Sequence, residues 1–495
     1  MISNRRTRTA FNILTASCLL LVDSCTVGPN FRPPAAPDVS GYTTTPLTAT
    51  AATPGVTGGG VQHFNDGRDI PGEWWTLFHS RPLDKLIERA LKANPGLKAA
   101  QAALLVAREN VLAQRGAYSP NVTAGFSASR QKTSAEISPT PASGELNFSL
   151  FTPQVSVSYV PDVFGLNRRT VEYLTAEEQQ ARFALVATDI ALSANVVAAA
   201  IEEASLRAQI AATRKLVAIN ANMIQVLRAQ YAKGSASALD VAVQESQLAQ
   251  VTSSLPPLLK QLAQQRDLLA ALAGGFPNQD LEEKFDLAGL QLPLELPVSL
   301  PSRLVRQRPD VRQAEENLHA ASAGIGIAVA NRLPNITLTA DAGTMALSTS
   351  QLFTRDAGFW GVGENLTQPV FDGGILLHRE RAARDAYVQA QEQYRSTVIT
   401  AFENVADTLN ALRHDADTLR TAAAAADAAH ITLELVRQQI RIGGGSQLAL
   451  LNAEQSYRQS QISLMQAQAS RYTDTAALFV ALGGGWWNRV HLSHN

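Results

Sequence analysis

The fold of this chain depends on one stretch, which runs from Arg308-Pro309-Asp310-Val311 to Phe371-Asp372-Gly373-Gly374. After Val311, apolar residues recur with helical spacing until Leu333-Pro334-Asn335, where proline cannot continue a helix. Ile336-Thr337-Leu338-Thr339-Ala340 then alternates apolar and polar side chains, as an amphipathic strand does. A polar loop and a second extended run follow. The stretch therefore predicts a helix followed by a pair of strands.

The same unit occurs once more, about 210 residues earlier in the chain, and this period is too long for a solenoid repeat. The corresponding positions are Pro95 with Pro309, Pro120-Asn121 with Pro334-Asn335, Gly234 with Gly443, Ser237 with Ser446, and Leu239 with Leu448. We therefore expect an internal tandem duplication. Repeat 1 would span residues 81–291 and repeat 2 residues 292–485, with strand pairs at about 120–161 and about 335–369 and a C-terminal tail at 486–495.

The N-terminus has the layout of an export signal. A basic start (Arg5, Arg6 and Arg8) precedes an apolar run too short to span a bilayer. Val22-Asp23-Ser24 before Cys25 resembles a bacterial lipobox, which predicts a signal peptide of residues 1–24 and acylation of Cys25. The alternative is a plain signal peptide with an incidental cysteine. Cys18 would leave with the signal, so no intrachain disulfide is expected.

Residues 25–80 should form a lipid-anchored, extended segment, because they are rich in Pro, Thr, Gly and Ala and bury little apolar surface. Trp74-Trp75 and Phe78 lie near its end. We expect these aromatic side chains to anchor the segment against the first helices.

Two long stretches without proline or glycine predict two very long helices, from about Leu166 to Tyr231 and over residues 375–442. At the rise of an α-helix each would measure roughly 95 Å. Each ends at a glycine turn, after which Ser237 and Ser446 fit the N-caps of returning helices, with Asp240 three residues into the first. Pro256-Pro257 predicts a kink in the first returning helix.

Each chain thus offers four amphipathic strands of about ten residues, which is enough to cross a bilayer when tilted. Four strands cannot close a barrel, and an open edge is not tolerated in lipid. Two chains would give eight strands and a filled interior, whereas three would give twelve strands and a lumen. The small Ser and Thr side chains on one strand face favour the open lumen.

Several motifs occur in one order along the chain, and together they resemble the outer-membrane factor (TolC-like) family in its OprM/NodT-type lipoprotein branch. They are Cys25-Thr26-Val27-Gly28-Pro29-Asn30-Phe31, Trp74-Trp75-x-x-Phe78, Arg308-Pro309-Asp310-Val311, Pro334-Asn335 and Gln368-Pro369-Val370-Phe371-Asp372-Gly373-Gly374. The resemblance implies an α+β membrane protein: a trimeric, twelve-stranded transmembrane β-barrel continued by a long periplasmic α-helical barrel. It also implies a lipid-anchored outer-membrane export duct that works with a periplasmic adaptor and an inner-membrane pump of the RND type.

The same resemblance indicates where the channel would close. Family channels narrow at the periplasmic end, where Leu and Asp residues after the second glycine turn ring the pore. Leu448 and Asn452 match these positions and share one helical face. Because Asn452 is neutral, Asp240 is the alternative source of negative charge, although it could serve only as a cap, and Leu448 could serve only in packing. Gly234 and Gly443 would mark the adaptor-docking tips, or be plain helix-ending glycines.

No pattern points to an enzyme, a metal site or a cofactor. The eight histidines lack metal-ligand spacing, and Gly443-Gly444-Gly445-Ser446 lacks the lysine of a phosphate loop. A formal net charge of −1 gives no indication of nucleic acid as a partner. The alternatives to an export duct are a lipid-anchored structural coiled coil without a pore and a periplasmic lipoprotein enzyme. The sequence does not identify the exported substrate.

Overall fold

A computed structural model describes residues 26–132, 147–279 and 281–489. The predicted signal peptide (residues 1–24) and Cys25 lie outside the described residues. The chain forms two compact units. Among the described residues, the first unit comprises 26–34, 104–132, 147–180 and 314–394, and the second comprises 35–103, 181–279, 281–313 and 395–489. Each unit takes segments from both sequence repeats.

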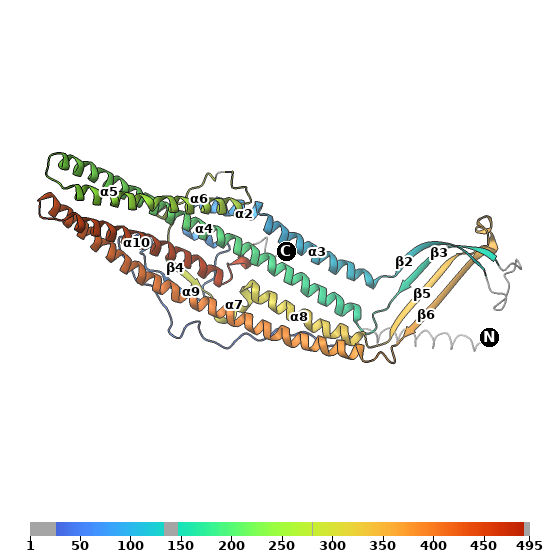
Figure 1. The fold of residues 1–495 in the computed structure, drawn as a ribbon. Helices are drawn as coiled ribbons and strands as arrows, with labels where there is room; N and C mark the ends of the chain where they lie inside the picture. Colours follow the sequence, from blue (N-terminus) through green and yellow to red (C-terminus); the bar gives the residue numbers. More distant parts are fainter. Residues whose placement is uncertain (1–25, 133–146, 280, 490–495) are drawn as a thin grey trace. The chain divides into compact units, whose positions relative to one another are not determined.

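The first unit contains a four-stranded antiparallel sheet in the order β2-β3-β5-β6 (Figure 1). Its strands are β2 (Asn121–Lys132), β3 (Asn147–Tyr159), β5 (Asn335–Thr344) and β6 (Gly358–Thr367). The strand pairs fall where alternation of apolar and polar residues predicts them. The two pairs come from the two repeats and join through β3 and β5, so one sheet draws on both copies.

Long helices connect the strands to the rest of the chain. Those that reach into the first unit are α3 (Pro95–Arg115), α4 (Leu166–Ala232), α8 (Pro309–Ala330) and α9 (Ile375–Arg441). Both α4 and α9 have 67 residues, which confirms the two long helices expected from the absence of proline and glycine. One stretch of α4 is apolar enough to cross a bilayer, but 61 % of it is buried within the fold, as in the core helix of a soluble protein.

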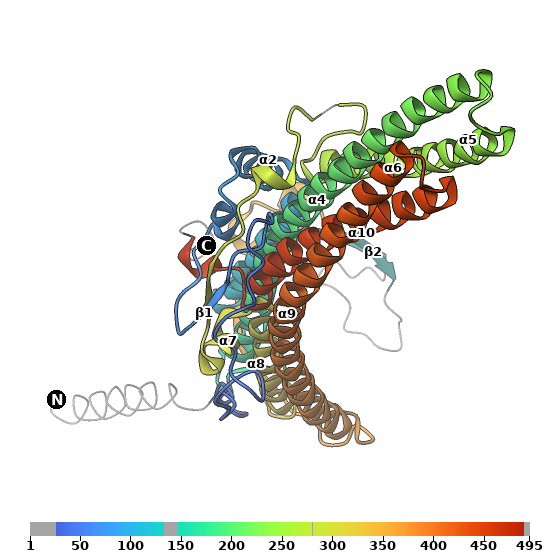
Figure 2. The same cartoon turned by 90° about the vertical axis from the view of Figure 1, so that its left-hand side faces the viewer.

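The second unit contains the two helical hairpins. After α4 the chain returns through α5 (Ala238–Ser253) and α6 (Leu255–Leu272), and after α9 it returns through α10 (Gln447–Ala481). The expected kink is a break at Ser254, directly before α6, which carries the two prolines in its first turn. Helices α5 and α10 lie side by side (Figure 2), and the Gln455 amide donates to Gln250 Oε1 over 3.1 Å.

The N-terminal segment and the start of repeat 2 pair with each other, which the sequence did not indicate. Strand β1 (His63–Asp66) runs parallel to β4 (Glu295–Val298), and a short helix α7 (Pro301–Gln307) follows. Neither strand alternates clearly, and their pairing joins residues about 230 positions apart. Short 3-10 helices complete the described elements: η2 (Trp74–Phe78), η3 (Gly116–Tyr118), η4 (Leu287–Gly289), η5 (Thr349–Gln351), η6 (Arg355–Ala357) and η7 (Trp486–Asn488).

Trp74 and Phe78 are completely buried, so η2 is an anchor as expected. It packs against α2 (Arg81–Ala93), the first helix. It also packs against α10, because the Trp74 ring stacks on Phe479 with 5.5 Å between ring centroids. The sequence indicated the first contact but not the second, which joins opposite ends of the chain.

Candidate functional site

The four-stranded sheet has one apolar and one polar face. Residues directly opposite each other on neighbouring strands share a face. One row across all four strands is therefore apolar: Val122, Val157, Ala340 and Val362. The row beside it is small or polar: Thr123, Ser156, Asp341 and Gly361. A sheet of this kind separates an apolar medium from water.

In a single chain, the apolar face leaves large side chains exposed. Trp360 is 79 % exposed and Val362 77 %, and Val122 and Phe126 are similarly open. An apolar patch of this kind requires a covering medium or partner. Within the described residues β2 pairs only with β3, and β6 only with β5, so both outer strands also keep unpaired backbone edges.

The two hairpin turns have matching geometry. Gly234 and Gly443 adopt left-handed φ angles of 76° and 82°, which glycine adopts without strain. After each turn a serine begins the returning helix: Ser237 Oγ accepts from the Asp240 N–H over 3.1 Å, and Ser446 Oγ from the Ala449 N–H over 3.1 Å. Both predicted caps are confirmed.

The candidate gate residues follow these caps. Leu448 and Asn452 are both exposed on α10, one turn apart. Asp240 Oδ2 accepts from the Ser237 N–H and hydroxyl over 2.9 and 2.7 Å. These hydrogen bonds hold the pKa of Asp240 below its usual value. Asp240 therefore caps α5, and its hydrogen bonds to Ser237 hold the carboxylate beside the first turn of that helix.

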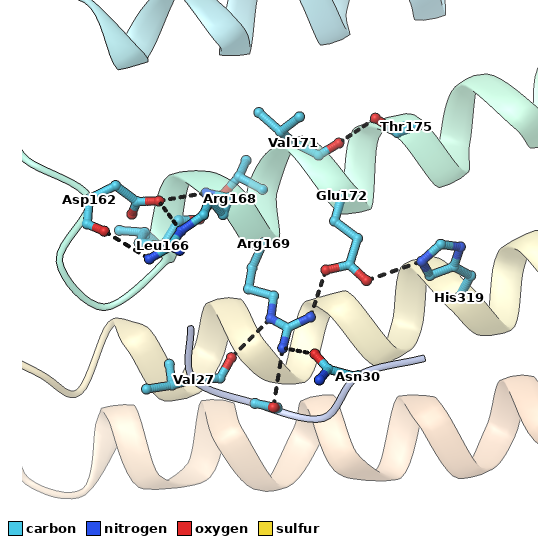
Figure 3. Close-up of polar contacts among 12 residues, drawn as sticks. Val27, Asn30, Asp162, Leu166, Arg168, Arg169, Val171, Glu172, Thr175 and His319 are labelled. Carbon is cyan, nitrogen blue, oxygen red and sulfur yellow. Dashed lines mark hydrogen bonds and ion pairs between the residues drawn. The ribbon is translucent and has the colours of Figure 1, made fainter. Parts of the chain in front are cut away.

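A second cluster of polar contacts holds the residues that follow Cys25, and no sequence pattern indicated it (Figure 3). Arg169 on α4 is 3 % exposed and donates to the carbonyls of Val27 and Gly28 over 2.9 and 3.2 Å. It also donates to the Asn30 side-chain oxygen over 2.9 Å and pairs with Glu172 over 2.7 Å. We call Val27–Asn30 the N-terminal seat segment.

Two further contacts fix this seat segment. The Val27 N–H donates to the Phe164 carbonyl, between β3 and α4, over 3.2 Å. A Cβ on Gly28 would lie 2.4 Å from the Gly326 Cα of α8, so the backbones touch. The segment is thus held at the junction between strand β3 and helix α4. The partners lie about 140 residues apart or more, which explains why local sequence patterns missed them.

Comparison with known proteins agrees with the duplicated architecture. A family model described as outer membrane efflux protein matches residues 86–275 and 300–484, which together make up most of the chain. The chain belongs to the outer membrane efflux protein family. The two matched segments correspond to the two repeats found in the sequence.

Individual members of the outer membrane efflux protein family resemble nearly the whole chain. The toluene efflux pump outer membrane protein TtgF of Pseudomonas putida is 31 % identical over 488 residues, covering 96 % of this chain and 97 % of that protein. The outer-membrane channel OprN matches with a TM-score of 0.80 and 26 % identity, covering 93 % of this chain and all of that one. The Campylobacter jejuni CmeC outer membrane channel shares the fold at a TM-score of 0.84 and 20 % identity, over 95 % of this chain and 97 % of that one.

Membership in the outer membrane efflux protein family confirms the expected family, fold class and general function. The chain is an outer-membrane exit channel of a tripartite efflux system, not a structural coiled coil. The comparisons do not address individual site residues. Leu448, Asn452 and Asp240 as a gate, and Gly234 and Gly443 as docking tips, stay predictions, and so does acylation of Cys25.

Proposed function

We propose that three copies of this chain join their sheets edge to edge into a twelve-stranded barrel that conducts small molecules across the outer membrane. The observation that carries this proposal is the sheet itself, with one apolar face, one polar face and two unpaired edges. Lipid would cover the apolar face, water would fill the polar side, and neighbouring chains would pair the edges.

The small side chains of the polar face favour three chains over two. An eight-stranded barrel has an interior that side chains fill. Here, a Cβ placed on Gly125 or Gly361 would meet nothing within 4 Å, and Thr123 and Ser127 flank Gly125 on the same face. Such residues leave an eight-stranded interior empty, whereas twelve strands turn the same space into a lumen.

Native mass spectrometry of the detergent-extracted protein, combined with conductance in planar bilayers, tests this assembly. We expect a mass of three chains and ion-conducting channels from the same fraction. A monomer that conducts ions would overturn the edge-pairing argument. A trimer that never conducts would retain the edge pairing and reject the open lumen of the barrel.

The hairpin tips are where the periplasmic adaptor would dock, with an RND-type pump behind it. The turns at Gly234 and Gly443 expose apolar side chains beside them: Tyr231, Leu239, Ile442 and Leu448. Apolar side chains at the core of a contact are typical of protein interfaces. Site-directed crosslinking from Leu239 and Ile442 in cells that co-express a periplasmic adaptor tests the contact, and crosslinks found only far from the tips would place the adaptor elsewhere.

Acylation of Cys25 would place a lipid two residues before the N-terminal seat segment. The seat supports this anchor, because Val27 is held beside the end of β3, at the boundary expected for the membrane. Mass spectrometry of the mature N-terminus should find a diacylglyceryl-modified Cys25. An unmodified N-terminus that begins elsewhere would refute the anchor without affecting the barrel.

A further inference from the structure

Asp341 differs from every other described residue on the polar face of the sheet, because it alone is ionisable. The register assigns that face to alternate residues of β2, β3, β5 and β6. The others are Ser, Thr, Asn, Gln and Gly, together with Phe148, Leu150 and Phe359.

The remaining ionisable residues of the four strands fall on the opposite face. Glu364 lies opposite Leu338 in the register, near the end of β6 that leads into α9. Arg130 and Lys132 lie at the far end of β2, on the face that carries Val122 and Phe126. The sheet therefore presents a single charge, and a negative one, on the side that faces water in the proposed barrel.

No neighbour of Asp341 among the described residues neutralises this charge. Its partners in the register are Ser156 on β3 and Gly361 on β6. Within the part of the chain that the structure describes, no Lys, Arg or His lies in an ion pair with it. Gly361 has open space where a Cβ would be, so packing within this chain does not require a glycine there. The carboxylate is left free for what passes through the lumen.

We propose that the Asp341 carboxylates of three chains form a ring of negative charge in the barrel lumen that favours cationic over anionic cargo. The proposal rests on the trimeric barrel of the proposed function. Rings of carboxylates favour cations, and low-dielectric walls focus their field. This ring places the cation preference in the barrel, whereas the gate position carries the neutral Asn452.

The electrostatic potential that Asp341 produces can be measured at position 339. Thr339 shares the polar face with Asp341 and lies about 7 Å from it along β5. A cysteine at position 339 should react with water-soluble thiol reagents supplied from outside the cell. The ratio of its rates with a cationic and an anionic methanethiosulfonate reports the local potential. This measurement does not depend on the hairpin tips being open. The wild-type protein, with Cys25 as the one cysteine left after removal of the signal, gives the background.

We expect Asp341→Asn in the Thr339→Cys protein to lower this rate ratio, by roughly twofold at physiological salt and up to nearly tenfold at low salt. Glu364→Gln, the matched control on the other face, should leave the ratio unchanged. A ratio that does not respond to Asp341→Asn at low salt, or that responds equally to Glu364→Gln, overturns the proposal.

A second control separates this proposal from the barrel itself. Ala340 lies next to Thr339 but on the apolar face, so Ala340→Cys should be protected by lipid and react with neither reagent. Reaction at Ala340→Cys in place of Thr339→Cys would reverse the faces and overturn the proposed barrel. Labelling at Thr339→Cys alone, without an effect of Asp341→Asn, would retain the barrel and reject the charge ring.

Discussion

Ser237 and Asp240 hold each other at the start of α5: the Asp240 N–H donates to Ser237 Oγ over 3.1 Å, and Asp240 Oδ2 accepts from the Ser237 N–H over 2.9 Å. Ser237→Ala removes one half of this capping box and should destabilise the tip of the first hairpin by about 1 kcal/mol. Hydrogen exchange of the amides in the first turn of α5 measures the loss, since a local opening need not affect the melting of the whole assembly.

The second hairpin supplies the matched control, because Ser446 caps α10 with Ala449 in place of an aspartate. The pKa of Asp240 is lowered in the folded state, so its contribution is present above the unfolded pKa and is lost as pH falls through the folded pKa. Protection at the first tip should therefore fall in acid, whereas the cap at Ser446 has no titrating partner. Equal acid sensitivity of both tips would contradict this assignment.

Arg169 should hold the N-terminal seat segment, because it donates to three acceptors in that segment from a buried position. Arg169→Ala should lower the free energy of opening this segment by about 2 kcal/mol, which is roughly a thirtyfold loss of protection at the Val27 amide. Arg169→Lys should recover only part of the protection, because an ammonium lacks the planar fork of the guanidinium. Unchanged protection in both variants would show that other contacts hold the segment.

Substitution of Gly28 tests whether the close backbone contact with Gly326 also holds the seat segment. Its φ of 90° and a Cβ position 2.4 Å from the Gly326 Cα make Gly28→Ala both strained and sterically blocked. Gly55 has a similar φ of 77° with nothing within 4 Å of its Cβ, so Gly55→Ala carries the strain without the clash. We expect Gly28→Ala to raise exchange at Val27 far more than Gly55→Ala raises exchange at the amides next to Gly55. Equal local effects would assign the requirement to backbone strain.

His319 should make the seat sensitive to pH. Its ring stacks on Phe31 at 4.4 Å, and hydrogen bonds to Glu172 and Glu316 raise its pKa to about 9. The raised pKa means that the stabilisation is complete below the unfolded value of 6.5 and is lost as pH rises through about 9. Protection of Val27, corrected for intrinsic exchange, should fall over that range. His319→Gln should remove the pH dependence, and a wild type without it would refute the interpretation.

The sequence predicted what local patterns control. The absence of proline and glycine located α4 and α9, alternation located the strands, and Ser237 and Ser446 marked the helix starts. It missed contacts between distant residues. Three such contacts leave no periodic signal in the sequence, because each joins residues far apart in the chain. They are the pairing of β1 with β4, the stacking of Trp74 on Phe479 and the hydrogen bond from Arg169 to the Val27 carbonyl.

The polar face of the sheet shows the same limit of local sequence patterns. Alternation assigned Asp341 to the polar side of its own strand, but only the register across four strands shows that no other ionisable residue shares that side among the described strand residues. The candidate gate residues were located in a different way, by resemblance to a family motif. Motif resemblance placed Leu448 and Asn452, and the structure adds that both are exposed on one face of α10 in a single chain.

The duplicated hairpins allow a direct test of the gate. Leu448 and Leu239 occupy equivalent positions after the two caps, and both are exposed, at 62 % and 71 %. If three Leu448 side chains close the resting channel, Leu448→Ala should raise its conductance in planar bilayers and admit antibiotics that are normally too large. Leu239→Ala removes the same apolar volume at the other tip and should change resting conductance less. Asn452→Asp adds three charges with little change in volume, so it should shift ion selectivity more than conductance. Equal conductance in wild type and Leu448→Ala would place the closure elsewhere, and a larger effect of Leu239→Ala would move it to the first hairpin.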